Sequence, residues 1–165
     1  MKTLKKKIES SFDNINITVT DNNMDISIDK NGIVTLLSFL KNMGYEHLAL
    51  ISCVDLPDEK LLEIVYILSA YMENDKKFTE KEARNIIVKT RIPRDKANFV
   101  TVIDIFENAE PYERELHELF GIHFQGHPRL TPLFLELEYK IPPFRKDFDT
   151  RKFVKQFFEN IPAVE

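Results

Sequence analysis

The sequence predicts an α+β fold in which helices cover one face of a mixed β-sheet. Three observations lead to this prediction. The hydrophobic patterns of the first 92 residues follow the order helix, strand, strand, helix and three strands. Two helices for five strands are too few to cover both faces of a sheet, which indicates a two-layer arrangement. The chain has 165 residues, of which 43% are hydrophobic, so it can bury one substantial core.

The N-terminal elements are a helix and a hairpin. Leu4, Ile8 and Phe12 recur at the spacing of one helical face. Apolar and polar residues then alternate over residues 15–19 and again over residues 24–28, with a polar turn between the two runs. This pattern predicts two short antiparallel strands.

A second helix and a long strand come next. Apolar residues between 34 and 40 give the helix its buried stripe, Asp29 or Asn31 can cap its start, and Gly44 stands where a helix ends. Residues 47–56 form the strand. We therefore expect the long strand to follow directly from the second helix.

Two more strands complete the predicted sheet. They lie within residues 61–72 and 85–92, and a charged loop over residues 73–82 separates them. The runs 48–54 and 64–69 are almost continuously apolar, as in strands that are buried on both faces. We expect either the C-terminal third of the chain or a partner to cover the second face.

A short helix precedes the C-terminal third. Asn108 or Glu110 opens it, Pro111 fits its first turn, and Gly121 ends it. Its apolar stripe has the spacing i, i+4, i+7 and i+8 and consists of Tyr112, Leu116, Leu119 and Phe120.

The C-terminal segment has the pattern of an extended arm. Four prolines exclude a helix over residues 127–144, and residues 133–141 alternate like an extended strand with one apolar edge. Asp149 or Thr150 can cap a closing helix that carries Phe153, Phe157 and Phe158. We therefore divide the chain into an α/β domain, residues 1–121, and a partner-binding arm with its closing helix, residues 122–165.

Composition excludes several functional classes. With 23 basic and 27 acidic side chains the net charge is −4, which gives no reason to expect nucleic-acid binding. The longest apolar run, residues 61–72, is too short to span a bilayer. The N-terminus starts basic but lacks the apolar segment of a signal peptide, so we expect a cytoplasmic protein. The single Cys53 cannot form an internal disulfide or hold an iron–sulfur cluster by itself, and its apolar neighbours predict a small buried hydrophobe.

Histidines offer one candidate for chemistry. His117-Glu118 begins like the zinc-protease motif, but Gly121 stands where the second histidine ligand is needed. His123 and His127 have i, i+4 spacing in a segment that cannot be helical. A metal site made of His117, His123 and His127 is one interpretation, and hydrogen bonds from loop histidines to the backbone are the other.

Charged residues crowd the short helix before Gly121. Glu110, Arg114 and Glu118 form a ladder of i, i+4 pairs, with Glu113 and Glu115 beside it. Such a ladder is ordinary on an exposed helix face. The sequence contains no nucleophile elbow, phosphate-binding loop or dinucleotide fingerprint to which these charges could belong.

Two segments carry a family resemblance. Residues 112–122, Tyr-Glu-Arg-Glu-Leu-His-Glu-Leu-Phe-Gly-Ile, and residues 124–128, Phe-Gln-Gly-His-Pro, resemble the signature of the 30 kDa subunit of respiratory complex I. The family includes the counterpart subunits of membrane-bound, energy-converting [NiFe] hydrogenases. Val54-Asp55 and residues 143–148 match as well, so the resemblance extends over about residues 47–148. Departures occur at Glu110-Pro111, Thr131 and Phe134, and the segment 131–133 is closer to hydrogenase-type or ferredoxin-linked complexes.

The resemblance implies a subunit that is not catalytic and binds no cofactor of its own. It would pack on the large subunit and near the small iron–sulfur subunit of an NADH or ferredoxin dehydrogenase or an energy-converting hydrogenase. The iron–sulfur clusters and the quinone or NiFe site would lie in those partners, and electron transfer would be coupled to ion translocation. The chain would lie on the cytoplasmic side of the membrane, held there by its partners. The alternative is a stand-alone metal-dependent enzyme that uses the three histidines.

The resemblance also assigns roles to motif residues. Glu113, Arg114 and Glu115 would position the helix through ion pairs within the chain and across the interface, and Gly121 and Gly126 would permit tight turns. The ends of the arm would be pinned by two short motifs, namely His127-Pro128 and Arg145-Lys146-Asp147. Arg145 is the candidate for a bidentate contact with a partner carboxylate.

Overall fold

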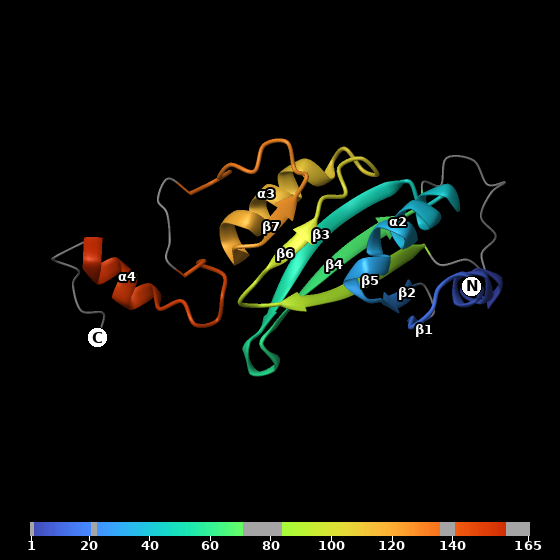
Figure 1. Ribbon diagram of the computed structural model, residues 1–165, viewed down its shortest axis with the longest axis horizontal. Helices are drawn as coiled ribbons and strands as arrows, with labels where there is room; N and C mark the ends of the chain where they lie inside the picture. Colours follow the sequence, from blue (N-terminus) through green and yellow to red (C-terminus); the bar gives the residue numbers. More distant parts are fainter. Residues whose placement is uncertain (1, 21–22, 71–83, 136–140, 158–165) are drawn as a thin grey trace.

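The computed structural model describes residues 2–20, 23–70, 84–135 and 141–157 (Figure 1). The helices are α1 (Lys2–Ser11), α2 (Ile33–Asn42), α3 (Ala109–Phe120) and α4 (Thr150–Phe157), with short 3₁₀ turns at Lys30–Gly32 and Pro57–Glu59. The strands are β1 (Asn16–Val19), β2 (Asn23–Ser27), β3 (His47–Leu56), β4 (Leu61–Ser69), β5 (Asn85–Pro93), β6 (Asn98–Val100) and β7 (His123–Gln125).

The main sheet has five strands in the order β1-β2-β5-β4-β3. Its neighbours pair antiparallel except for β2 and β5, which run parallel. The predicted α+β fold with a mixed sheet is confirmed, and the predicted helices and the strands of the main sheet follow one another along the chain as expected. A second sheet, in which β6 and β7 pair in parallel, was not predicted, because each strand has three residues and is too short to show a period in the sequence.

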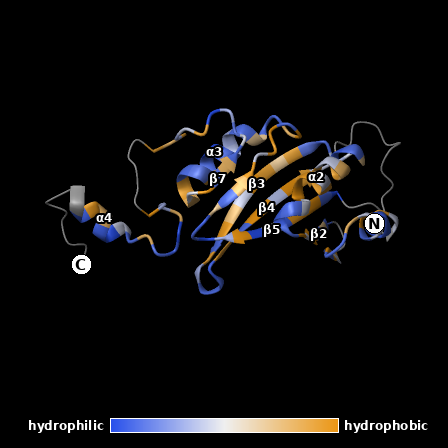
Figure 2. Cartoon of the chain, viewed as in Figure 1, coloured by the Kyte–Doolittle hydropathy of each residue, from blue (hydrophilic) through white to orange (hydrophobic). Residues whose placement is uncertain are grey.

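One face of the sheet carries the core. The side chains of Met24, Ile64, Tyr66 and Val88 on that face are fully buried, and α2 lies in front of it (Figure 1). The helices contribute the buried residues Leu4, Ile8, Ile33, Leu36, Leu37 and Leu40. Alternating apolar and polar residues along the strands are visible in Figure 2. The single cysteine, Cys53, belongs to this core, as predicted.

The opposite face of β3 remains open. Leu50 is 38% exposed and Val54 is 42% exposed, so the described residues of the C-terminal third do not cover this face. The alternative, that a partner covers it, stays a prediction. On β4, buried and half-buried residues alternate strictly. An apolar residue on an open strand face gives the same sequence signal as one in a covered strand, so the sequence alone does not distinguish a face covered by this chain from a face covered by a partner.

The ends of the helices follow the sequence in part. Asp29 makes no side-chain capping bond at the 3₁₀ turn, and α2 begins after that turn with Gly32 at its N-cap, so neither predicted cap residue starts α2. Gly44, with a φ of 101°, follows the end of α2 as predicted. At α4 the backbone N–H of Lys152 donates to the Asp149 carboxylate at 3.0 Å, the expected N-terminal cap.

The C-terminal segment differs from a simple arm. Ile122 and Phe124 are buried in the core, and β7 pairs with β6, so the chain leaves the folded body after the predicted boundary at residue 121. Residues 131–135 contain no strand. Residues 136–140 of the predicted extended segment, the charged loop 73–82 and Phe158 lie outside the described residues. In the part of the chain that is described, no helix is long and apolar enough to cross a membrane.

Candidate functional site

The motif residues lie on α3 and in the segments that leave it. Two side chains attach α3 to the edge strand β3. They belong to Asn108, which precedes the helix, and to Tyr112 in its N-terminal half. The amide of Asn108 donates a hydrogen bond to the Leu48 carbonyl at 2.8 Å, and the Tyr112 hydroxyl donates to the Ala49 carbonyl at 3.0 Å. These bonds occupy two carbonyl groups of the sheet edge and fix the position of α3.

Glu113 is the buried residue of the motif. Its side chain is fully buried, and its carboxylate accepts hydrogen bonds from the Thr101 hydroxyl at 2.6 Å and the Val102 N–H at 2.7 Å. Burial raises the pKa of Glu113 to about 7, against the lowering effect of these two bonds. The predicted exposed ladder of ion pairs is therefore wrong for this residue.

A sequence signal for this burial exists. Glu113 has i−4 spacing to Ala109, i+3 spacing to Leu116 and i+7 spacing to Phe120, and all three of these residues are buried. Glu113 was not assigned to this buried face because a charged side chain on a helix is normally exposed.

Arg114 and Glu118 hold the first part of the arm. The guanidinium of Arg114 donates to the carbonyls of Thr131 at 3.0 Å and Pro132 at 2.9 Å. Glu118 accepts from the N–H of Leu133 at 3.1 Å and of Phe134 at 2.9 Å, and the N–H of Leu135 donates to the same carboxylate. The backbone of residues 131–135 is thus attached to side chains of α3. These hydrogen bonds do not involve the side chains of residues 131–135.

Glu110 extends this arrangement at the start of α3. Its carboxylate pairs with Arg114 at 3.3 Å, the predicted i, i+4 contact, and with Arg129 at 3.1 Å. The hydrogen bond from Arg129 and the neighbouring guanidinium of Arg114 lower the pKa of Glu110. The residues that follow His127 are thereby connected to the first turn of α3.

The arm returns to the C-terminal end of α3. The N–H of Phe144 donates to the Leu119 carbonyl at 3.0 Å, and Nε of Arg145 donates to the Phe120 carbonyl at 2.8 Å. Gly121 has a left-handed φ of 71°, and a Cβ atom there would lie 2.8 Å from Pro142 Cγ. Gly121 therefore allows both the helix to end and the arm to pass close by.

A buried ion pair holds the segment beyond Arg145. Arg94 donates to the two oxygens of Asp55 at 2.7 and 3.1 Å and to Asp147 at 2.6 Å. The N–H of Lys146 donates to Asp55 at 2.8 Å. The hydrogen bond from Arg94 lowers the pKa of the Asp55 carboxyl. Sequence reasoning missed Arg94, because an arginine after a strand has no distinguishing pattern.

The candidate metal ligands are not brought together. Nδ1 of His117 lies 2.8 Å from the Ile122 carbonyl oxygen, and Nε2 of His127 lies 3.3 Å from the Glu110 carbonyl oxygen. Nδ1 of His127 accepts from the N–H of Arg129 at 3.0 Å, and His123 is exposed on β7. Within the described ranges, no group of three or more His, Cys, Asp or Glu residues could hold a metal ion.

The remaining predicted residues lie around α3. Gly126 has a φ of 87°, and a Cβ atom there would lie 3.2 Å from Thr101 Cγ2, so this turn favours glycine. Glu115 is half-buried on α3, and Pro128 is exposed after the turn.

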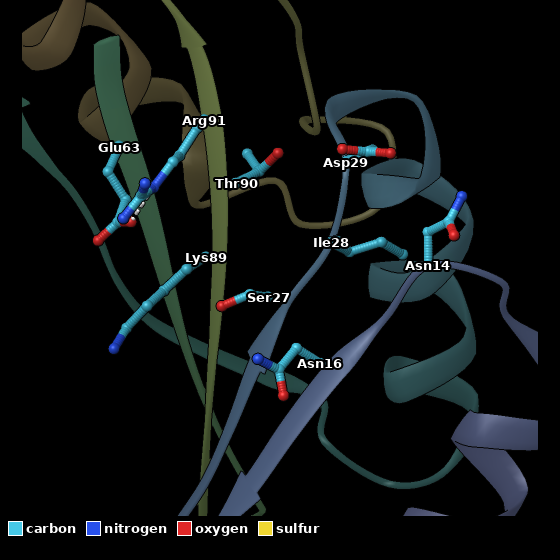
Figure 3. Close-up of a pocket in the computed structure, with 9 residues that line it drawn as sticks. All are labelled: Asn14, Asn16, Ser27, Ile28, Asp29, Glu63, Lys89, Thr90 and Arg91. Atoms are coloured by element: carbon cyan, nitrogen blue, oxygen red, sulfur yellow. Dashed lines mark hydrogen bonds and ion pairs between the residues drawn. The ribbon is translucent and has the colours of Figure 1, made fainter. Parts of the chain in front are cut away.

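An open pocket of about 340 Å³ lies away from the motif, across the neighbouring strands β1, β2, β5 and β4 (Figure 3). Its lining residues are Asn14, Asn16, Ser27, Ile28, Asp29, Glu63, Lys89, Thr90 and Arg91. The cations in it are already paired, Arg91 with Glu63 at 2.8 Å and Lys89 with Asp25 at 3.4 Å. This pocket contains none of the residues that the sequence singled out for chemistry or for the arm.

Comparison with known proteins identifies similar chains. A family model described as the 30 kDa subunit of respiratory-chain NADH dehydrogenase matches residues 26–154. A subunit of the F420H2 dehydrogenase of Methanosarcina mazei is 35% identical over 124 residues, which are 74% of this chain and 73% of that protein. A subunit of the NADH-quinone oxidoreductase of Neorickettsia sennetsu is 32% identical over 117 residues, 70% of this chain and 58% of that protein.

Two solved structures have the same fold. A chain of the membrane-bound sulfane sulfur reductase, described as an archaeal respiratory membrane complex, aligns with a TM-score of 0.84 and 27% identity over 99% of this chain and 94% of that one. The trypsin-resistant fragment 1–134 of Nqo5 aligns with a TM-score of 0.63 and 25% identity over 79% of this chain and 100% of the fragment.

Proposed function

This chain belongs to the family of the 30 kDa subunit of respiratory-chain NADH dehydrogenase, and from that premise we propose that it is a non-catalytic, structural subunit of a membrane-bound oxidoreductase related to complex I. Its role is to pack against the large subunit and to support electron transfer coupled to ion translocation. The C-terminal arm is the part that reaches the partner.

The contacts made by the charged motif residues support this proposal most directly. Arg114 and Glu118 bind the backbone of residues 131–135, and Asp55 binds Arg94 and the backbone of Lys146. These groups fix the path of a segment and do not converge on a cavity. Such an arrangement suits the presentation of an arm to a partner better than it suits the conversion of a substrate.

The names of the similar proteins support the same proposal. Their complexes are named after F420H2, NADH and quinone, or sulfane sulfur, whereas the chains share one fold or family. Substrate recognition would require differences between these subunits, because the complexes act on different substrates. A subunit with the same fold in all of them is therefore unlike a substrate-binding subunit. Donor and acceptor would be bound by other subunits.

Partners, cofactors and location are part of the proposal. The large subunit and the small iron–sulfur subunit of the complex would flank this chain and would hold the iron–sulfur clusters and the quinone or NiFe site. The chain itself would hold no cofactor. It would lie at the cytoplasmic side of the cell membrane and would be retained there by its partners.

Affinity purification from native membranes tests the proposal. The tagged chain is produced in its own cell, the membranes are solubilised in mild detergent, and the purified proteins are identified. We expect a large subunit and an iron–sulfur subunit in amounts equal to that of the tagged chain. Recovery of the chain alone, without these subunits, would contradict the proposed function.

A truncated variant provides the control. A tagged chain that ends at residue 128 keeps β7 and its pairing with β6 but lacks residues 129–165, the part of the arm that follows β7. We expect this variant to fold and to lose most of the large subunit. Full retention of the large subunit would show that the arm is not the part that binds the partner.

A further inference from the structure

Two phenylalanines of the arm are far more exposed than aromatic residues normally are. Phe134 is 67% exposed and Phe144 is 59% exposed, whereas Phe99, Phe106, Phe120 and Phe124 are all buried. A large apolar side chain that water surrounds loses the free energy that burial would supply. Most of the apolar surface of these two side chains is therefore left unburied by the chain itself.

The backbone beneath each of these side chains is held in place. The N–H of Phe134 donates to the carboxylate of Glu118 at 2.9 Å, and the N–H of Phe144 donates to the Leu119 carbonyl at 3.0 Å. The ring of Phe144 also packs edge-to-face on Phe120, with centroids 5.8 Å apart. The two exposed residues are thus attached to one turn of α3, residues 118–120.

Attachment to one turn has an energetic consequence. A flexible segment must lose backbone entropy when it binds, whereas a segment whose backbone is already fixed loses less. Exposed rings on a fixed backbone have the properties of interface anchors, since a few buried aromatic residues supply most of the binding free energy in protein interfaces.

The charge of the surrounding segment limits the kind of partner. Residues 141–157 contain five basic side chains (Arg145, Lys146, Arg151, Lys152, Lys155) and two acidic ones (Asp147, Asp149), a net charge of +3 in a chain of net charge −4. Asp147 is already paired with Arg94 at 2.6 Å. The basic excess favours a partner surface rich in carboxylates.

We propose that Phe134 and Phe144 are paired anchors that enter apolar pockets on the large subunit, and that carboxylates around these pockets face the basic segment 141–157. This inference rests on the proposed function, because it names the contact through which the arm holds its partner. Figure 1 shows that the segment after β7 runs past α3 towards the end of the molecule at which α4 lies, and that β1 lies at the opposite end. The two anchors and the start of the basic segment lie close together, because Phe134, Phe144 and Arg145 all bind residues 118–120 of α3.

Binding kinetics test the aromatic anchors and the basic segment separately. The large subunit, identified by the purification described above, is immobilised, and association and dissociation rates of the full-length chain are measured at low and at high ionic strength. Phe134→Ala and Phe144→Ala are each compared with wild type. Val19→Ala is the matched control, because Val19 is 38% exposed and lies at the opposite end of the molecule.

Each phenylalanine variant is expected to dissociate about tenfold faster or more, with an unchanged association rate. The double variant Arg151→Ala/Lys152→Ala is expected to associate more slowly and to lose most of the salt dependence. Val19→Ala should behave like wild type. Phe134→Ala removes an exposed ring, so its melting temperature should stay at that of wild type, which shows that the fold is retained.

The contrary outcomes are distinct. If the wild-type chain binds the large subunit and both phenylalanine variants dissociate at the wild-type rate, the anchor inference is wrong while the proposed function stands. If the wild-type chain does not bind the large subunit at all, the proposed function itself fails. Phenylalanine-dependent binding to anionic lipid vesicles without the large subunit would overturn the anchor inference in favour of a lipid surface.

Discussion

Arg94 and Asp55, 39 residues apart in the chain, form a two-point ion pair in which Nε and Nη2 of Arg94 lie 2.7 and 3.1 Å from the two carboxylate oxygens. The Asp55 side chain is 1% exposed and the Arg94 side chain is 12% exposed. Through Asp147 and the N–H of Lys146 the same pair also holds the end of the arm. Stability of the body and placement of the arm therefore depend on one buried contact.

Arg94→Ala should destabilise the chain strongly. The change leaves the buried Asp55 carboxylate without its cation, which costs about 3–5 kcal/mol in comparable buried pairs. Urea unfolding monitored by circular dichroism measures the loss. The matched control is Lys89→Ala, whose pair with Asp25 is about one-third exposed on both sides and should contribute less than about 1 kcal/mol. Equal losses in the two variants would contradict the importance of the Arg94–Asp55 pair.

Glu113 should give the chain an unusual pH dependence. The folded chain keeps the Glu113 proton up to a pKa of about 7, whereas the ordinary value is 4.5. The folded state then binds more protons than the unfolded state between these pH values, so the free energy of unfolding falls as the pH rises through this window, by at most about 1.4 kcal/mol per pH unit. Above the window the contribution of Glu113 is constant.

Glu113→Gln should remove this contribution. The amide is neutral at every pH, its oxygen can still accept from the N–H of Val102, and its NH₂ can donate to the Thr101 hydroxyl oxygen. The difference in unfolding free energy between wild type and variant, measured from pH 5 to pH 8, should shift in favour of the variant up to about pH 7 and then level off. A difference that does not vary with pH would show that Glu113 titrates below this range in the folded chain.

The sequence predicted the fold better than it predicted the contacts. Periodicity located α1, α2, α3 and the five strands of the main sheet, because each of them is long enough to show its period. It placed Glu113 on the wrong face of α3, since a charged side chain on a helix is normally exposed. It also could not pair Arg94 with Asp55, because tertiary contacts between distant residues leave no local pattern.

Glu118→Ala should release the first part of the arm without unfolding the body. Three backbone N–H groups, those of residues 133–135, lose their common acceptor. Hydrogen–deuterium exchange should show faster exchange at these three amides, and exchange in β4 and β5 should stay as in wild type. Glu115→Ala, on the same helix, is the control. Unchanged exchange at residues 133–135 would mean that Glu118 does not hold the arm.

Replacing either of two leucines near the start of β3 by aspartate should have very different effects on stability. Leu48 is 1% exposed and Leu50 is 38% exposed, so Leu48→Asp buries an unpaired carboxylate and Leu50→Asp does not. We expect Leu48→Asp to be unfolded and Leu50→Asp to melt within a few degrees of wild type. Loss of the fold in Leu50→Asp would show that the open face of β3 is covered in solution.

The burial of Cys53 makes the chain suitable for site-specific labelling. Burial raises the pKa of this thiol to about 12, so almost none of the reactive thiolate is present at neutral pH. The sequence has one cysteine. A cysteine introduced at an exposed position of the arm would therefore be the preferred site for a maleimide fluorophore, and the natural cysteine could stay in place. Distances between the arm and a labelled partner could then be followed during assembly by energy transfer.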